Sequence, residues 1–285
     1  MNHFRCRLAA TFVAALPFLA PIASPAMAQE EEEHSTLTIG AGIAAIPSYE
    51  GSDDYRVMPL VQARGKVHDF AFWTRGTALY VDAIPDPTGT GVDFELGPMV
   101  NVRLDRTSRK AIRDDAVRLL GTRDAAVEVG GFVGVGKTGV ITSDYDNLSA
   151  RVAVTKDVAG AHGSYVVTPT IEYFTPLSMT TFVGASVSAE YVGKKYGRYY
   201  FDITPQESAA SGLAVYDRAG GSGFKRFNAN LSAGKSLSGD LRKGWAVFGV
   251  AGYSRVLGKY ADSPIVADAG SRNQFVGAIG IGYTF

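Results

Sequence analysis

Hydrophobic and polar side chains alternate along much of this chain with a period of two residues. In the segment from Val92 to Asp105, VDFELGPMVNVRLD, the even positions carry apolar side chains and the odd positions carry most of the polar ones. Such a segment is longer than a typical globular strand of roughly 5–6 residues. It is long enough for a tilted strand to cross a bilayer, which takes about 9–11 residues. The alternation therefore predicts membrane-spanning β-strands.

The same pattern recurs in eleven segments, and we expect each of them to form a strand. Single-chain bacterial barrels have an even number of strands. We therefore expect twelve, with the missing strand in 138–147 or within a loop, and ten as the alternative. The predicted fold is all-β: a transmembrane antiparallel up-and-down β-barrel with long loops on one side. The expected strands are 36–46, 57–67, 70–82, 92–105, 125–137, 148–157, 164–175, 181–192, 224–237, 244–257 and 274–285.

Aromatic residues near the ends of these strands favour a membrane barrel over a soluble β-sandwich. Aromatic side chains gather at the two interfaces of a bilayer. Pro98 and Pro169 fall inside predicted strands, where each removes a backbone donor, but the alternation continues on both sides of each proline. The aromatic residues at strand ends are Tyr165, Tyr173, Tyr191, Phe224, Trp245, Tyr253 and Tyr283.

The connections between the predicted strands are polar or rich in glycine. Residues 106–124 have apolar and charged positions at near-helical spacing, which predicts a short helix. Residues 193–223 and 258–273 are expected to be long loops, whereas 237–244 is expected to be a short turn.

The last segment, QFVGAIGIGYTF, is an amphipathic strand that ends on Phe285. Tyr283 and Ile281 lie in phase with this terminal aromatic residue. Such an ending resembles the signal that the outer-membrane assembly machinery reads. We therefore expect Phe285, Tyr283 and Ile281 to form the assembly signal, and the small inward residues of this strand to leave room for side chains from across the barrel.

The N-terminus predicts export. Residues 1–28 combine arginines, a short apolar segment and Ala26-Met27-Ala28, which is typical of a cleaved signal peptide. Residues 29–35 are expected to be an acidic flexible N-terminus, and 36–285 the barrel. We therefore expect the protein in the outer membrane of a Gram-negative-type bacterium, surrounded by outer-membrane lipid.

Composition excludes several kinds of site. Without the signal peptide the chain holds 26 basic and 28 acidic residues, which gives no electrostatic footprint for nucleic acid. The single cysteine, Cys6, lies in the signal segment, so no thiol remains for a disulfide, a metal site or a nucleophile. The remaining histidines are widely spaced. We therefore predict no cofactor and no metal site.

The segment GFVGVGKT, from Gly131 to Thr138, fits the pattern of a phosphate-binding loop. A genuine loop of this kind needs a helix that begins at its Lys-Thr. Here the chain continues as GVITSDYDNL, which has turn formers and no helix start. The glycines belong to the alternation of 125–137. We therefore predict a membrane strand with valines toward lipid and small residues toward the lumen, and no bound nucleotide.

Three segments carry a resemblance to a known family. They are PSYEGSDDYRVMPL from Pro47, RYYFDITPQESAASGLAVYDRAGG from Arg198, and LGKYADSPIVADAGSRNQFVGAIGIGYTF from Leu257. Their Tyr-Glu-Gly-Ser motif, their Thr-Pro-x-x-Ser-x-x-Ser-Gly-Leu loop and their aromatic end resemble the MipA/OmpV family of exported outer-membrane proteins, whose namesake is the MltA-interacting protein.

The resemblance implies a non-enzymatic scaffold of the cell envelope. The family's named member links a lytic transglycosylase to a bifunctional murein synthase, so these two enzymes are the implied partners. Other members have adhesive, antigenic or uptake roles. No catalytic residues define the family, so none are transferred to this chain.

Two other functions remain open. The first is a narrow passive channel or uptake porin, narrow because ten to twelve strands enclose less space than the 16–18 strands of porins. The second is an outer-membrane lipid hydrolase that uses Ser164 and His162. It is less favoured because these two residues are neighbours in sequence, whereas catalytic triads assemble from separate segments. The polar residues expected to face the lumen are Glu95, Arg103, Glu128, Glu172, Glu190 and Arg226.

Overall fold

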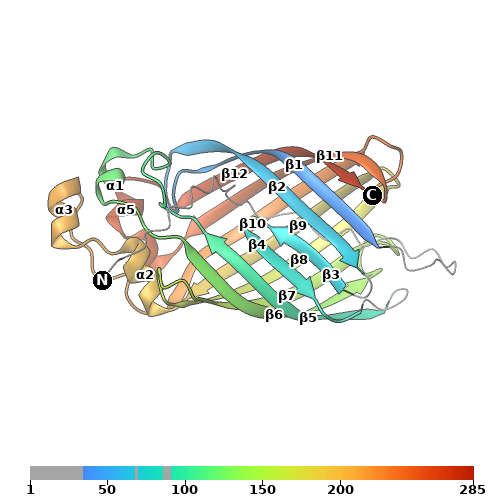
Figure 1. The fold of residues 1–285 in the computed structure, drawn as a ribbon, viewed down its shortest axis with the longest axis horizontal. Helices are drawn as coiled ribbons and strands as arrows, with labels where there is room; N and C mark the ends of the chain where they lie inside the picture. The colour runs from blue at the N-terminus through green and yellow to red at the C-terminus, as the bar shows by residue number, and fades with distance from the viewer. Residues whose placement is uncertain (1–34, 68–69, 86–90) are drawn as a thin grey trace, which may run out of the picture.

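The computed structural model describes residues 35–67, 70–85 and 91–285, and these residues form one closed antiparallel barrel (Figure 1). The expected signal peptide, and all of the expected acidic N-terminus except its last residue, lie outside the described residues. The strands are β1 Thr36–Pro47, β2 Tyr55–Val67, β3 Phe70–Arg75, β4 Ala78–Asp82, β5 Val92–Arg103, β6 Ala126–Thr138, β7 Asn147–Asp157, β8 Tyr165–Ser178, β9 Thr181–Val192, β10 Gly223–Ser236, β11 Gly244–Val256 and β12 Asn273–Thr284. Each strand pairs with its neighbours in sequence, and β1 closes on β12. The predicted twelve-stranded barrel is confirmed.

The place given to the twelfth strand was wrong. The single strand expected at 70–82 is a hairpin of β3 and β4 that turns at Gly76 and Thr77. The turn shifts the alternation by one position, because the paired residues Trp73 and Tyr80 share a face although one position is odd and the other even. Apolar or aromatic residues occur on both faces of this short hairpin, so the shift does not stand out in the pattern. Residues 139–146 form a turn instead of a strand, because the carboxylate of Asp146 accepts the backbone N–H groups of Val140 and Ile141.

The outer surface of the barrel is apolar between two aromatic girdles. The girdle at the helical end contains the contacting rings of Tyr191 and Phe224, 5.2 Å apart. At the other end Tyr283 contacts Trp245, with ring centroids 4.9 Å apart. Val133, in the middle of β6, is 58% exposed. The GFVGVGKT segment therefore lies in a membrane strand, and no helix follows it.

Both prolines predicted to lie inside strands occur where a ladder is interrupted. Beside Pro98, Leu96 donates its backbone N–H to the side chain of Asp82 rather than to a backbone oxygen. Beside Pro169, the pairing of β8 with β9 is absent between Val167 and Thr170. Neither proline therefore removes a ladder hydrogen bond, because the ladder is already interrupted at its position.

The short β3–β4 hairpin leaves part of the barrel wall without strands. β3 has 6 residues and β4 has 5, whereas the other strands have 11 to 14. β2 pairs with β1 from Tyr55 to Lys66, but with β3 only from Arg64 to Val67. We call this stretch of the wall without strand pairing the side opening; it lies between residues 55–62 of β2, the turn at 76–77 and residues 102–105 (Figure 1).

Pro59 lies on the edge of β2 that borders the side opening. Ala63 donates its backbone N–H to the side chain of Thr74 on β3, at 2.9 Å. Backbone N–H groups alternate between the two sides of a strand, so the nitrogens of Val57, Pro59 and Val61 face the same side as that of Ala63. A proline at such an edge removes no ladder bond.

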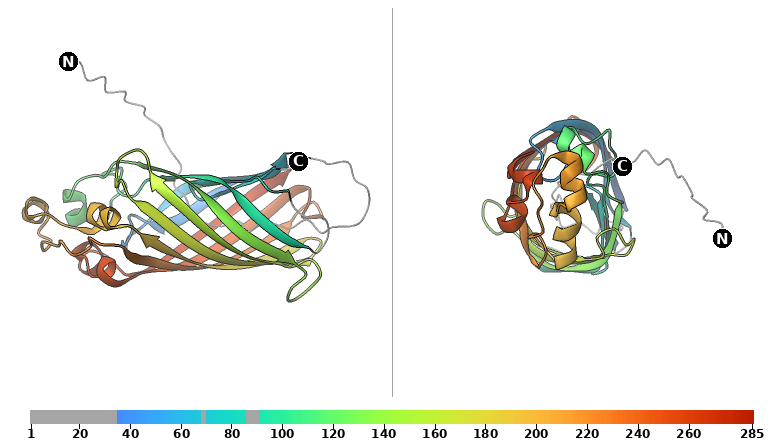
Figure 2. Two further views of the ribbon diagram at one scale, coloured as in Figure 1. Left: turned by 90° about the horizontal axis from the view of Figure 1, so that it is seen from below. Right: turned by 90° about the vertical axis from the view of Figure 1, so that its left-hand side faces the viewer.

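Helices cover the end of the barrel that carries the long connections. Figure 2 shows them lying across the mouth, and the C-terminus lies at the opposite end (Figure 1). The short helix predicted within 106–124 is confirmed, whereas the two expected loops at 193–223 and 258–273 each contain two helices. The helices are α1 Asp115–Leu119, α2 Lys194–Phe201, α3 Pro205–Ser211, α4 Gly258–Ala261 and α5 Pro264–Ala267. Among the described residues, none of these helices has the length and apolar character needed to cross a membrane.

The helices missed by the alternation have their own local causes. Thr204 and Glu207 form a reciprocal capping box at the start of α3, with Pro205 in its first turn. α2 buries Tyr196, Tyr200 and Phe201 against α4 and the ends of neighbouring strands. We call helices α1 to α5, with the loops that join them, the helical cap. These apolar contacts attach the helical cap to the barrel.

Candidate functional site

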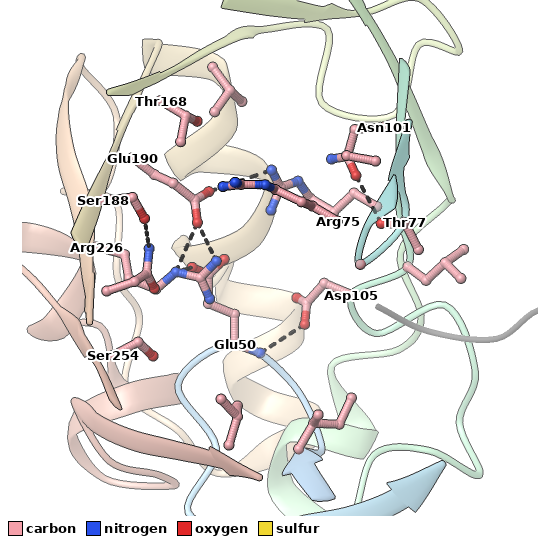
Figure 3. A pocket seen from close by; sticks show the side chains of 18 of the residues that line it. Glu50, Arg75, Thr77, Asn101, Asp105, Thr168, Ser188, Glu190, Arg226 and Ser254 are labelled. Atoms are coloured by element: carbon pink, nitrogen blue, oxygen red, sulfur yellow. Dashed lines mark hydrogen bonds and ion pairs between the residues drawn. The ribbon is translucent and has the colours of Figure 1, made fainter. Parts of the chain in front are cut away.

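A cavity of about 320 Å³ lies inside the barrel beneath the helical cap. In Figure 3, Ser188, Glu190 and Arg226 lie on one side of it, and Thr77 and Asn101 on the other. The side chains come from strands on both halves of the barrel. Charged, hydroxyl and amide groups share the cavity lining with apolar side chains, so a ligand would meet both kinds of surface.

A buried group of charges joins the cavity to the cap. The ammonium of Lys225 forms ion pairs with Glu50 and, at 3.1 Å, with Glu190. It also donates to the hydroxyl of Tyr196 at 3.0 Å, and that hydroxyl donates to Glu50 at 3.0 Å. Arg226 forms a second ion pair with Glu190. Lys225 has no exposed side-chain surface, so its charge depends on these partners.

The pKa of Glu50, which lies in the loop after β1, reflects this group. Burial would raise the pKa of its carboxyl, but the nearby charges of Lys225 and Arg226 outweigh burial and lower the pKa below its ordinary value. Burial raises the pKa of the Tyr196 hydroxyl well above its ordinary value. Glu50 is therefore an anion and Tyr196 a neutral hydroxyl at neutral pH.

A second part of this group centres on Glu128. Its carboxylate accepts from Nε of Arg103 at 2.8 Å and from Asn101 at 2.7 Å. Nε2 of His162 lies 3.1 Å from the same carboxylate, and Nδ1 of His162 accepts the backbone N–H of Ser164. Both ring nitrogens are thus engaged, and the hydroxyl of Ser164 is not the group that His162 contacts. This geometry does not favour a Ser-His nucleophile.

A second cluster forms the floor of the cavity. Arg151 donates to Glu95 at 2.6 Å and to Glu172 at 3.1 Å, and Arg75 pairs with Glu172 from across the barrel. The guanidinium of Arg151 lies 4.8 Å from the ring centroid of Trp73. The floor therefore combines cation–π contacts with buried ion pairs.

Three aromatic rings complete the floor. Trp73 and Tyr80 stack with centroids 5.4 Å apart, and Phe132 meets Trp73 edge to face at 5.5 Å. Farther round the wall, Phe248 covers the small residues Gly40 and Gly280. The room left by the small residues of β12 is thus taken by a ring of the neighbouring strand, not by side chains from across the barrel.

The structure brings the six sequence-predicted lumen residues into two groups. Arg103, Glu128, Glu190 and Arg226 belong to the group beneath the cap, and Glu95 and Glu172 to the floor. The sequence analysis missed five of their partners. These are Glu50, Arg75, Arg151, His162 and Lys225.

Two of the missed residues left a signal in the sequence. Arg151 lies on the polar face of the same alternation that predicted β7. Lys225 is the extra residue of a β-bulge, where the register shifts between Phe224 and Arg226. Phe224 and Phe227 are 53% and 39% exposed and stand three positions apart, so one residue between them must break the alternation. Glu50 lies in a loop, where alternation carries no information.

The family model of the MltA-interacting protein MipA matches residues 39–285. The chain belongs to the MipA family. The match covers the whole described barrel apart from the start of β1, so the charge groups and the cap belong to a MipA-type barrel. As a family member with this fold, the protein is an outer-membrane β-barrel.

Solved structures that resemble this MipA-family barrel do so only distantly. The chain is similar to outer-membrane expressed OmpT of Vibrio cholerae, with 9% identity, coverage of 90% of this chain and 99% of that one, and a TM-score of 0.34. It is similar to the translocator domain of the autotransporter NalP from Neisseria meningitidis, with 16% identity, 88% coverage of both chains and a TM-score of 0.37. It is also similar to the Pseudomonas putida toluene transporter TodX, with 9% identity, coverage of 95% and 94%, and a TM-score of 0.31. Likenesses at these scores carry no argument about function.

A comparison with curated proteins finds no match. In the part of the chain that the structure describes, no three His, Cys, Asp or Glu side chains gather in a way that could hold a metal ion.

Proposed function

We propose that this MipA-family barrel is a non-enzymatic, non-conducting scaffold of the cell envelope. Its proposed partners are a lytic transglycosylase of the MltA type and a murein synthase. The observation that supports the proposal is the set of buried side chains that occupy the lumen. The floor of Arg151, Trp73, Tyr80 and Phe132 and the helical cap lie in series along the barrel, so a solute would have to displace both.

Opening the floor would be costly. Arg151 and Glu172 each have 3% exposed side-chain surface. Separating one member of a buried ion pair from its partner costs about 3–5 kcal/mol. A passive pore needs a continuous water-filled path through the lumen. The buried ion pairs of the floor therefore favour a protein that binds partners on its surface over one that conducts solutes.

The surface we propose for partners is the end opposite the helical cap. Barrels of this type carry short turns on the periplasmic side and longer loops outside, and murein enzymes work in the periplasm. Three turns at that end, 139–146, 178–180 and 237–243, are linked to the same part of the wall: Thr142 bonds Thr175 at 2.9 Å, and the backbone N–H of Leu241 bonds Met179. We call them the turn platform.

The turn platform exposes apolar side chains. Ile141 is 64% exposed and Met179 is 55% exposed. Exposed apolar side chains that gather on one surface mark places where another protein can dock. This supports an interaction role on the periplasmic side.

A pull-down tests the scaffold role. The barrel would be immobilised in detergent and offered a purified lytic transglycosylase of the MltA type. We expect retention by the wild type and loss of retention by the double variant Ile141→Asp, Met179→Asp. The matched control is Val215→Asp, an exposed apolar residue in the helical cap, which should retain the enzyme. Equal retention by all three proteins, or by none, would contradict the proposal.

A planar-bilayer recording tests the blocked lumen separately. We expect no conductance steps from the wild type at moderate voltage. Regular open steps from the wild type would instead favour the passive channel.

A further inference from the structure

The side opening interrupts the barrel wall at the depth of the hydrocarbon. Tyr55, at the border nearest the helical cap, lies at the level of the aromatic girdle of the helical end. Below it on the same face, Val57 is 70% exposed and Val61 is 52% exposed, as expected of side chains in contact with lipid. The gap therefore lies below the interface, where the wall would otherwise be closed by strands.

The backbone at the border of the side opening needs contact with protein or with water. Within the described residues, β2 at Val57 and Val61 pairs with β1 on one edge and has no strand partner on the edge that borders the side opening. Lipid cannot hydrogen-bond such backbone groups, and unpaired backbone at this depth is tolerated only where it is buried in protein or borders a water-filled cavity. The cavity beneath the cap supplies that water, because its lining includes Arg56 on one border and Thr77 and Asp105 on the others.

The lining of the cavity is electrically balanced. Its charged residues are four acids and four arginines: Glu50, Asp105, Glu128, Glu190, Arg56, Arg75, Arg103 and Arg226. An anionic headgroup would leave the cavity with an excess negative charge. A headgroup that carries one charge of each sign preserves the balance.

Arg56 is the cation placed to meet a ligand at the side opening. Its Nε atom is buried without a hydrogen-bond partner. A buried donor of a charged group without a partner is costly, so the site is one hydrogen bond short. Glu190 and Glu50 also line the cavity, where both pair with Lys225 (Figure 3).

We propose that the side opening admits one zwitterionic phospholipid of the phosphatidylethanolamine type. The headgroup lies in the cavity, with its phosphate bound by Arg56 and its ammonium among the acidic residues of the lining. The acyl chains leave through the side opening into the membrane. The cavity volume of about 320 Å³ is at the small end of ligand pockets, which suits a headgroup and not a whole lipid. This inference goes beyond the scaffold role and does not depend on it.

Native mass spectrometry of the purified barrel tests the proposal. The barrel would be incubated in detergent with phosphatidylethanolamine, with phosphatidylglycerol, or with a neutral glycolipid of the same acyl chains. We expect one phosphatidylethanolamine per barrel that survives the collision energy which removes the other two lipids. Retention of phosphatidylglycerol or of the glycolipid in its place would overturn the zwitterionic headgroup. The absence of any retained lipid would overturn the site.

Paired variants locate the site. Thr77→Trp places an indole at the border of the cavity, whereas Leu79→Trp places the same side chain on the lipid-facing side of the same hairpin, where Leu79 is 42% exposed. We expect the retained lipid to be lost in Thr77→Trp and in Arg56→Gln, and kept in Leu79→Trp. Equal retention in all three would mean that the lipid is bound around the barrel, and would overturn the proposal.

A measurement on the unaltered barrel covers the case in which a variant fails to fold. Phosphatidylethanolamine with a photoreactive group on its headgroup would be cross-linked to the wild type in vesicles of that lipid. We expect peptides that contain cavity residues such as Asn101 or Asn228 to be labelled. Labelling confined to the girdles and loops would overturn the proposal.

Discussion

Most of the charged residues inside this barrel are tolerated because they have partners of opposite charge. Lys225 shows how this is achieved. The β-bulge at the start of β10 turns both Lys225 and Arg226 into the lumen, where two glutamates from other elements meet them. Without the bulge, one of these two cations would face lipid, since successive side chains alternate across the wall.

Removing the charge of Lys225 should destabilise the barrel. In Lys225→Met, the carboxylates of Glu50 and Glu190 lose a shared cation in a buried site, and we expect the free energy of unfolding to fall by about 3–5 kcal/mol. Urea unfolding in lipid vesicles, followed by gel mobility, measures it. Lys194→Met, at an exposed position in the cap, should change it by less than about 0.5 kcal/mol. Similar values for the two variants would show that the ion pairs are not stabilising.

The floor offers a spectroscopic test at Trp73, because the sequence has two tryptophans. In a Trp245→Phe background, the fluorescence of the folded barrel reports Trp73 alone. We expect Arg151→Met to change the emission of Trp73 and to lower stability by about 2 kcal/mol or more through the lost cation–π and ionic contacts. Lys156→Met, exposed on the same strand, serves as the control. Unchanged Trp73 emission in Arg151→Met would contradict the contact.

Among the elements, regular strands were predictable from alternation, whereas irregular features were not. The two-residue turn between β3 and β4 shifts the alternation by one position, but both faces of this hairpin carry apolar or aromatic residues, so 70–82 was taken as one strand. A single side chain, Asp146, decides that 139–146 is a turn. Helices α2 to α5 are held by burial against the barrel, and such contacts between distant segments leave no local period. The capping box at Thr204 and Glu207 and the proline at the start of α5, Pro264, were local signs of helices in these segments.

The turn at 139–146 should depend on pH through Asp146. Burial would raise the pKa of this carboxyl, but backbone N–H groups of Thr142 and Val140 and the hydroxyl of Tyr173 outweigh burial and hold it well below the ordinary value. A lowered folded pKa means that the stabilisation is full above the unfolded pKa, near pH 4, and is lost as the pH falls through the folded pKa.

Asp146→Asn should therefore lower the free energy of unfolding by about 1–3 kcal/mol at pH 7. The difference between the variant and the wild type should shrink as the pH falls below about 4. Unfolding curves at pH 7, 4 and 2.5 measure this. Asp144→Asn, exposed in the same turn, provides the comparison. A difference that stays constant across this range would contradict the role of the ionised carboxylate.

For the whole molecule, the alternation was sufficient to predict a closed barrel in a membrane, because every strand must show one face to lipid. It also identified the faces that carry the inward charges. It could not predict which charges meet, since Arg75 and Glu172 pair across the barrel between strands far apart in sequence. The side opening was not predicted, because 70–82 was expected to be one full-length strand.

The role of the C-terminus in assembly stays a prediction at this scale. The backbone N–H of Phe285 bonds Leu37 at 2.9 Å, and its ring contacts Tyr283. We expect deletion of Phe285 to remove most of the folded barrel from the outer membrane of expressing cells, while refolding of purified protein into detergent is little changed. Phe275→Ala alters an equally exposed ring at the other end of β12 and should assemble normally. Normal membrane levels of the deleted chain would contradict the signal.

The unpaired edge of β2 has a further consequence for neighbouring molecules. An open strand edge is a template on which a strand of another chain can add. Pro59 stands in the middle of this edge without an N–H, so an incoming strand would lose a central bond and lie against the proline ring. Pro59 removes no hydrogen bond from the barrel itself. It therefore protects the barrel from edge-to-edge association with other barrels in a crowded membrane.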